Sequence, residues 1–135
     1  MKYKFLPHTA DVKFKAYGEN LNDCFENSAL AMFNTIYDGK VKSFKQIKFS
    51  IKGKDFENLL YLFLEKLLIL LDSKNFFVSK IKVKINIKDM SLNVLVYGDN
   101  SGNYSLNTGV KSVTYNEMFV KKINGKWVCQ VVLDV

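Results

Sequence analysis

An alternation of apolar and polar residues between positions 78 and 96 constrains the fold of this chain more than any other feature. Valine and isoleucine interleave with lysine over 78–88, and leucine and valine repeat at every second position over 92–96. This period of two is typical of strands that bury one face and expose the other to water. The segment is therefore predicted to form antiparallel strands, followed by a turn at 98–102 that begins and ends with glycine.

A second pair of strands is predicted near the C-terminus. Two apolar runs cover 110–123 and 126–133, and Asn124-Gly125 separates them. An Asn-Gly pair between two such runs is the strongest short signal for a β-hairpin. Residues 126–133 are thus expected to pair antiparallel with 110–123.

The first half of the chain carries two helical patterns. After Asn20, which has the properties of a helix N-cap, apolar residues repeat at spacings of three and four until Asp38-Gly39. Asp55 starts a second pattern that runs to about residue 72 and has few polar positions, so this helix is expected to be the more buried of the two. Short strands are predicted around the helices, at 4–6, 12–17 and 41–51.

The predicted order of elements is β-β-α-β-α-β-β-β-β, which indicates an α+β fold with two helices packed on one side of a mostly antiparallel β-sheet. The chain has 135 residues, of which 48% are hydrophobic, and this is typical of one domain that buries its own core. No internal repeat or linker divides the sequence. We therefore expect a single domain that covers residues 1–135.

The cysteines and the apolar segments indicate a soluble protein of a reducing compartment. Cys24 and Cys129 lie in apolar patterns and form no C-x-x-C pair, which fits reduced core thiols better than a disulfide scaffold or a structural zinc site. The N-terminus has no signal-peptide pattern, and Glu65 and Lys66 interrupt the most apolar segment, 59–71. The expected location is the cytoplasm, without a membrane partner.

The charge balance allows a nucleic-acid partner without identifying one. Twenty basic residues against thirteen acidic ones give a net charge of +7, and all of the basic residues are lysine. Without arginine, the chain lacks the planar group that reads guanine or grips phosphate with two hydrogen bonds. Two interpretations stay open: a solvated lysine surface, or an RNA-binding module that uses Lys80, Lys82, Lys84 and Lys88.

Most catalytic motifs are absent from the sequence. His8 is the only histidine, which excludes mechanisms with two imidazoles and the H-E-x-x-H zinc motif. There is no G-x-S-x-G elbow, Walker A loop or G-x-G-x-x-G motif, so hydrolase and nucleotide-binding enzymes lack their usual signatures here. A stand-alone enzyme would have to depend on a metal ion and to turn over without a partner.

Carboxylates in unusual places are the remaining chemical signal. Asp11 lies between a loop and a strand, and the sequence finishes with Asp134 and Val135. If the end is ordered, the Asp134 side chain and the Val135 α-carboxylate form a negative pair. A hard cation with oxygen ligands would stabilise that pair, with Asp11 as the third ligand. The competing interpretation is a turn-capping Asp11 and a frayed terminus.

Several separated motifs follow one another along nearly the whole chain. They are His8-Thr9-Ala10-Asp11-Val12, Ala16-Tyr17-Gly18, the helix from Cys24-Phe25-Glu26 to Met32-Phe33, Val110-Lys111-Ser112-Val113-Thr114-Tyr115, and Gly125-Lys126-Trp127 leading to Val131-Val132-Leu133-Asp134-Val135. Each fragment is modest by itself. In this order and in a chain of this length, they resemble the archease family.

The resemblance implies an accessory protein of the RtcB-type RNA ligase, which joins tRNA halves and other RNA ends. An archease is not itself a ligase: it promotes guanylylation of the ligase's active-site histidine and allows multiple turnover, in tRNA splicing and RNA repair. The family also binds a divalent cation, typically calcium with magnesium as the alternative, through an N-terminal Asp and the last two residues. By position these are Asp11, Asp134 and Val135, whose oxygen donors suit either ion. Contact with RNA is expected to be indirect or weak.

Two positions depart from the family pattern. Relatives commonly have an Asn-Glu pair in the second helix, where this chain has Glu65-Lys66, and many carry a histidine where it has Asn116. Roles of that glutamate or histidine therefore do not transfer. His8 is expected either to orient the metal ligands or to hold its turn, and Lys111 either to contact a partner or to lie in solvent. Trp127 is expected to pack in the core or the hairpin rather than to form a platform for base stacking.

Overall fold

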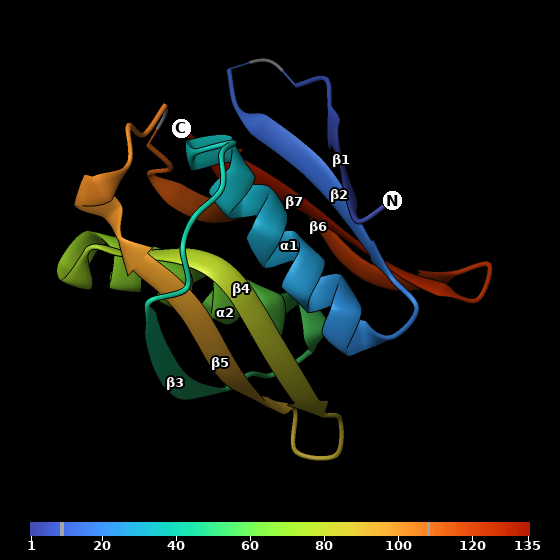
Figure 1. The fold of residues 1–135 in the computed structure, drawn as a ribbon. Coiled ribbons are helices and arrows are strands. Elements are labelled where there is room, and N and C mark those ends of the chain that lie inside the picture. The colour runs from blue at the N-terminus through green and yellow to red at the C-terminus, as the bar shows by residue number, and fades with distance from the viewer. Residues whose placement is uncertain (9, 108) are drawn as a thin grey trace.

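The computed structural model of the chain describes residues 1–8, 10–107 and 109–135; Thr9, which belongs to the first motif, lies outside the described residues. Within them, two α-helices and seven strands follow the predicted order (Figure 1). The elements are β1 (Tyr3–Leu6), β2 (Val12–Gly18), α1 (Leu21–Ile36), β3 (Lys45–Lys52), α2 (Phe56–Lys74), β4 (Phe76–Asn86), β5 (Ser91–Asn100), the short 3-10 helix η1 (Ser101–Asn103), β6 (Ser112–Ile123) and β7 (Lys126–Asp134).

The predicted α+β class is confirmed, but the strands form two antiparallel sheets where the sequence analysis expected one. The order is β1-β2-β7-β6 in the four-stranded sheet and β3-β5-β4 in the three-stranded sheet. Helix α1 packs against β2 and β7 of the first sheet and β4 of the second, and α2 packs against β6 of the first and β3 and β4 of the second. Period-two patterns identify strands without identifying their partners, which is why the division was not predicted.

Both helices begin at the predicted N-caps. The Asn20 side chain accepts a hydrogen bond from the Asp23 N–H (2.9 Å), and the Asp55 side chain accepts one from the Asn58 N–H (2.7 Å). These oxygens satisfy N–H groups that have no partner inside the helix. Helix α2 ends at Asn75, which adopts a left-handed conformation with φ of 53°.

Side chains of the helices also satisfy the free edges of two strands. The Val83 N–H of β4 donates to the Glu26 carboxylate (2.8 Å), and the Ile85 N–H donates to the Asn22 side chain (2.9 Å). On β6, the Val120 N–H donates to the Glu57 carboxylate (3.0 Å). Burial raises the pKa of Glu26 above its ordinary value, and the hydrogen bond from Val83 partly opposes that rise.

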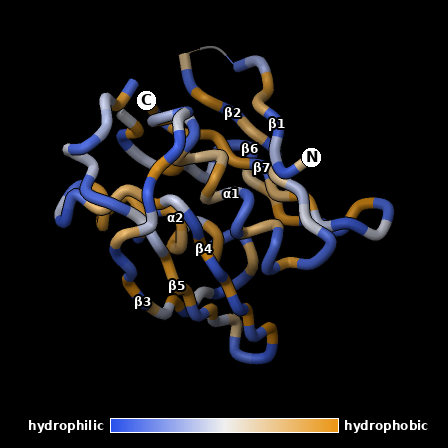
Figure 2. Tube along the Cα trace, viewed as in Figure 1, coloured by the Kyte–Doolittle hydropathy of each residue, from blue (hydrophilic) through white to orange (hydrophobic). Residues whose placement is uncertain are grey.

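One connected apolar core joins the helices to both sheets. Its largest contacts are aromatic: Phe25 of α1 stacks on Phe63 of α2 at 5.9 Å between ring centroids, and Phe33 meets Phe77 of β4 edge-to-face at 5.0 Å. Figure 2 shows the alternation of apolar and polar positions along β4 and β5. Trp127 packs edge-to-face against Phe56 at 5.7 Å, which confirms its predicted packing role. Neither described helix combines the length and hydropathy that a membrane span needs.

The two cysteines are core thiols, as predicted, and they lie side by side. Cys24 of α1 and Cys129 of β7 are both fully buried and free, with 2.8 Å between their sulfur atoms. The Cys24 thiol is also within 3.4 Å of the Ala16 carbonyl oxygen. Burial raises the pKa of Cys129 well above its ordinary value, so this thiol stays protonated and unreactive as a nucleophile.

The turn predicted at 98–102 begins later than expected. Gly98 lies inside β5, which continues to Asn100 before η1 starts. A bulge in β4 between Val78 and Lys80 brings the Phe77 carbonyl oxygen within 2.0 Å of the position that a Cβ atom at Gly98 would occupy. A glycine at position 98 therefore allows two strands to approach closely. It does not mark a turn, as the sequence pattern indicated.

Near the end of β5, a buried carboxylate organises the loop that follows the strand. Asp99 is 5% exposed and accepts hydrogen bonds from the Tyr104 hydroxyl (2.7 Å) and the Asn100 N–H (2.8 Å). The same hydroxyl accepts a hydrogen bond from the Lys42 N–H (2.9 Å). The hydrogen bond from Tyr104 is the main cause that lowers the pKa of Asp99 below its ordinary value of 3.8.

This lowered pKa predicts an acid-sensitive contribution to stability. The ionised Asp99 stabilises the fold above its unfolded-state value of 3.8, and this stabilisation is lost as the pH falls through the lower folded-state pKa. In Asp99→Asn, the free energy of unfolding should be lower at about pH 6 and should fall less towards about pH 3 than in the wild type, as measured by urea denaturation. The Tyr104→Phe variant should also weaken the dependence of the free energy of unfolding on acid, because it removes the main hydrogen-bond donor to Asp99. An unchanged dependence in both variants would contradict this account.

Candidate metal centre

Pairing of β2 with β7 brings two of the three predicted metal ligands to neighbouring positions. Val12 pairs with Leu133 at the end of this ladder; Asp11 immediately precedes β2 and Asp134 is the last residue of β7, so both follow that last pair. Figure 1 shows the start of β2 and the C-terminus at the same end of the molecule.

The end of β7 is held on its other side by β6. Asp134 pairs with Ser112, and its carbonyl oxygen accepts a hydrogen bond from the Lys111 N–H at 2.8 Å. Asp134 and Val135 are both half-buried. The main chain is therefore fixed at Asp134, one residue before the carboxylate that the sequence analysis proposed as a ligand. The Lys111 side chain is exposed, whereas its main-chain N–H makes the contact with Asp134.

His8 links the loop before β2 to β6. Its Nε2 lies 3.1 Å from the Glu117 carboxylate, and its Nδ1 lies 3.7 Å from the Asp11 carboxylate. Nδ1 is buried without a hydrogen-bond partner in the described structure. His8 thus lies near the predicted ligand Asp11 and contacts Glu117 of β6. Its two expected roles, orienting the metal ligands and holding the turn, involve the same imidazole ring.

Glu117 is the residue of this region that sequence reasoning missed. It adopts a left-handed conformation with φ of 53° in a bulge of β6 between Thr114 and Phe119. Its carboxylate accepts a hydrogen bond from Lys13 Nζ (3.1 Å), and its carbonyl oxygen accepts one from the buried Gln130 side chain (2.7 Å). The hydrogen bond from Lys13, followed by that from His8, lowers the pKa of Glu117. The only sequence signal was the polar Asn116-Glu117 pair, which interrupts the strand pattern.

Asp11 also borders an open cleft between β2 and the end of α1. The cleft has a volume of about 370 Å³, and its polar lining includes Asp38, Asn34 and Asn107. The Asp11 side chain is 31% exposed. One predicted ligand is therefore accessible from solvent, which a site that exchanges its ion requires.

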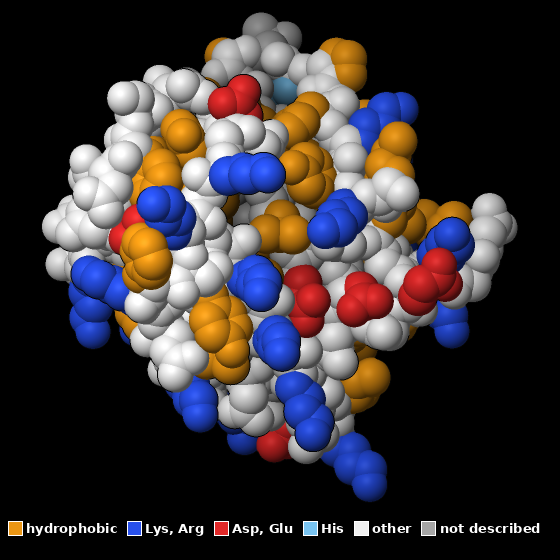
Figure 3. Space-filling view, viewed as in Figure 1, with side chains coloured by type: hydrophobic (Ala, Val, Ile, Leu, Met, Phe, Trp, Pro, Cys, Tyr) orange, Lys and Arg blue, Asp and Glu red, His pale blue; other side chains and the backbone are white. Residues whose placement is uncertain are grey.

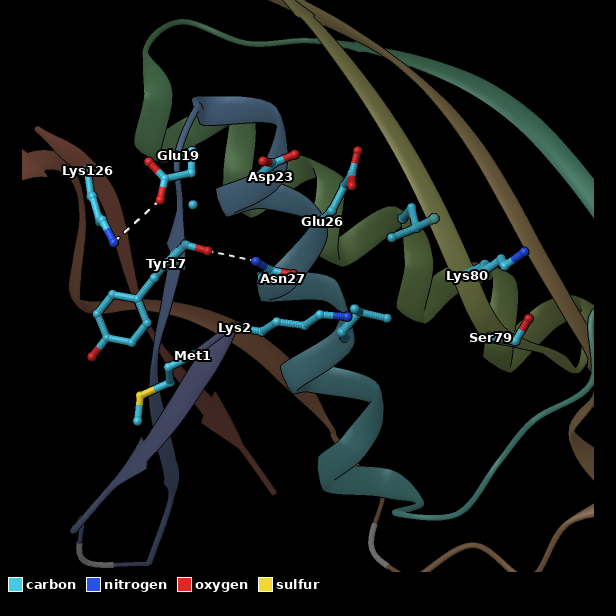
Figure 4. Close-up of a pocket in the computed structure, with 13 residues that line it drawn as sticks. Met1, Lys2, Tyr17, Glu19, Asp23, Glu26, Asn27, Ser79, Lys80 and Lys126 are labelled. Carbon is cyan, nitrogen blue, oxygen red and sulfur yellow. Dashed lines mark hydrogen bonds and ion pairs between the residues drawn. The ribbon is translucent and has the colours of Figure 1, made fainter.

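A second cleft carries more acidic residues, but two of its three carboxylates have other partners. It lies between α1, β2 and β4, with a volume of about 520 Å³, and Figure 4 shows Glu19, Asp23 and Glu26 along one wall. Glu19 pairs with Lys126 at 3.4 Å, and Glu26 accepts the Val83 N–H. Figure 3 shows acidic side chains beside a column of lysines on one face of the molecule.

The donor set of the first site fits a hard cation. Asp11, Asp134 and the predicted carboxylate at Val135 would supply oxygen atoms, which calcium and magnesium prefer. In the part of the chain that the structure describes, no three His, Cys, Asp or Glu side chains are grouped around a common point. The predicted site has only two such side chains, because its third donor belongs to the main chain. The buried Nδ1 of His8 faces this site from the side of Asp11.

The two departures noted in the sequence lie at the surface of the helix and of β6. Glu65 and Lys66 are half-buried on α2, and Glu65 is close enough to raise the pKa of Tyr61 together with burial of that phenol. Asn116 is exposed, and its main-chain N–H lies 3.3 Å from the Thr114 hydroxyl. Neither position contributes a ligand to the predicted site.

Comparison with known proteins gives matches over nearly the whole chain. Residues 3–135 match the model of the Archease protein family. The chain is 35% identical to "Protein archease" of Sulfolobus acidocaldarius, with 99% of each chain covered. It is 38% identical to "Protein archease" of Methanosarcina mazei, with 99% of this chain and 96% of the relative covered.

Solved structures give the same result for the fold. The solution structure of Methanobacterium thermoautotrophicum protein 1598 matches with a TM-score of 0.86 and 34% identity, and covers 99% of both chains. The crystal structure of a Thermotoga maritima protein described as an archease and possible chaperone matches with a TM-score of 0.63 and 16% identity, over 98% of this chain and 96% of that one. The second likeness concerns the fold alone.

Proposed function

The chain belongs to the archease family, and from this premise we propose that it is a protein cofactor that activates an RtcB-type RNA ligase. The observation that carries the proposal is the match to the family over residues 3–135, at an identity that extends to both ends of the chain. In this role the protein has no turnover of its own. It binds the ligase transiently in the cytoplasm and promotes guanylylation of the ligase and its return to the active state.

The proposed cofactor is a divalent cation, calcium in the first place and magnesium as the alternative. Asp11, Asp134 and the carboxylate of Val135 would hold it, and its charge would neutralise phosphate groups of a nucleotide bound to the partner. What supports this is the pairing of Val12 with Leu133, because Asp11 and Asp134 are the residues next to that pair in the chain. The contacts from His8 to Asp11 and Glu117 restrain the loop that carries one ligand.

A guanylylation assay tests this function directly. Purified chain is mixed with an RtcB-type ligase and radiolabelled GTP, in the presence of calcium, magnesium or a chelator, and the labelled ligase is quantified. The chain should increase labelling and allow more than one ligation per ligase, and the chelator should remove the increase. No increase with any ion would overturn the proposal, and RNA joining by the chain without ligase would favour a metal-dependent enzyme instead.

A further inference from the structure

The outer face of the three-stranded sheet has a regular arrangement of lysines around an apolar centre. On the central strand β5, Leu95 lies between Lys82 of β4 and Lys48 of β3. Neighbouring rows on this face place Tyr97 between Lys80 and Gln46, and Asn93 between Lys84 and Ser50. We call this surface, which comprises Gln46, Lys48, Ser50, Lys80, Lys82, Lys84, Asn93, Leu95 and Tyr97, the lysine face.

The charge of the lysine face is not neutralised by acidic side chains on the same face. Its four lysines are exposed, and no ion pair in the described part of the chain involves them. The Glu26 carboxylate attracts Lys82 from the edge of β4 while it accepts the Val83 N–H. Figure 3 shows lysine side chains gathered along β4. The face therefore presents a positive potential to solvent.

The centre of the lysine face is hollow and partly apolar. Lys48, Lys82 and Lys84 surround a depression of about 570 Å³ whose floor includes Leu95. Tyr97 extends the apolar floor, and Lys80 Nζ lies 5.8 Å from the centroid of its ring. Leu95 and Tyr97 are half-buried, so parts of both side chains remain open to a ligand.

This combination suits a single nucleic-acid strand better than an acidic protein. Alternate residues on a strand are about 6.6 Å apart, so the lysines of β4 form a row along which consecutive phosphates of an extended strand can lie. Bases stack on exposed aromatic rings whatever their sequence, and lysine contacts to phosphate need no particular geometry. An acidic peptide would use the row of charges but would gain little from a phenol ring between them.

We propose that the lysine face binds single-stranded RNA, with Lys48, Lys80, Lys82 and Lys84 on the phosphates and Tyr97 beneath a base. The choice of RNA rests on the proposed function, because an RNA ligase brings RNA ends to the same complex. Binding is electrostatic and sequence-independent, with a dissociation constant of about 10⁻⁴–10⁻⁶ M at physiological salt. The surface is separate from Asp11 and Asp134, which precede β2 and end β7 of the other sheet. Lys88, included in the sequence-based candidate, lies in the turn after β4 and outside this face.

Fluorescence anisotropy with a labelled oligouridine, in the absence of ligase, tests the proposal. The variant K48Q/K82Q/K84Q should bind at least about tenfold more weakly, and the slope of log affinity against log salt should fall by about 2, because three phosphate contacts are lost. The control K40Q/K54Q/K122Q removes three exposed lysines from other surfaces and should change affinity less than about twofold. Tyr97→Leu should weaken binding by about fivefold through lost stacking.

Three results would overturn the proposal: equal losses in both triple variants, no measurable binding at low salt, or competition by polyglutamate as strong as that by RNA. The Asp11→Asn variant should keep its RNA affinity, and K48Q/K82Q/K84Q should still stimulate guanylylation of the ligase. A lysine face that fails to bind RNA in a protein that still activates the ligase would reject this inference alone. Normal RNA binding by a protein that never stimulates a ligase would reject the proposed function alone.

Discussion

Asp11→Asn and Asp134→Asn should each reduce calcium affinity by at least about tenfold, or about 1.4 kcal/mol, measured by isothermal titration calorimetry. Each substitution removes a negative oxygen ligand while it keeps the size of the side chain. Stimulation of ligase guanylylation should fall in parallel. The fold should be little changed, because both side chains are half-buried at the end of the four-stranded sheet and lie outside the core.

A matched control separates loss of a ligand from loss of charge. Asp72→Asn removes one exposed carboxylate from α2, far along the chain from the site, and should leave both calcium affinity and stimulation unchanged. Thermal unfolding of all three variants shows whether the fold is retained. Full stimulation by Asp11→Asn and Asp134→Asn would reject the assigned site, whereas equal losses in the Asp72→Asn control would attribute the effect to net charge.

Residues added after Val135 should abolish most of the stimulation, because the new peptide bond replaces the α-carboxylate by a neutral carbonyl. Calcium affinity should fall by at least about tenfold, as for the loss of a side-chain ligand. The same short extension placed before Met1 provides the control. Met1 is exposed, and β1 begins beside Ala16, at the opposite end of β2 from Asp11. Equal activity of the two extended proteins in the guanylylation assay would exclude a ligand at Val135.

Local signals account for the parts of the fold that the sequence predicted. The caps at Asn20 and Asp55 act within three residues, and the Asn124-Gly125 turn acts between adjacent strands, with φ of 51° and 81°. Such features depend on neighbours in the chain and can be recognised without a tertiary structure. The assignment of strands to two sheets depends on partners far apart in the sequence. The role of Gly98 likewise depends on a bulge in another strand, so the pattern around it indicated a turn.

The candidate site shows the same division between local and distant information. The sequence analysis selected Asp11 because it lies between a loop and a strand, and Asp134 because it neighbours the Val135 carboxylate; the metal site that they would form stays a prediction. Glu117 could not be assigned, because its position follows from a bulge and from contacts with His8 and Lys13 more than 100 positions away. Residues that support a site from a distant strand carry no spacing that a sequence pattern could reveal.

The hydrogen bonds from β4 and β6 to the helices affect whether two copies of the protein can pair through their outer strands. Each sheet has two outer strands. On β4, Glu26 and Asn22 accept main-chain N–H groups, and on β6, Glu57 accepts one. The remaining outer strands are the four-residue β1 and the lysine-rich β3. Short or charged edges disfavour strand exchange between molecules. We therefore expect edge-to-edge pairing of two copies to be disfavoured at all four outer strands of the described structure.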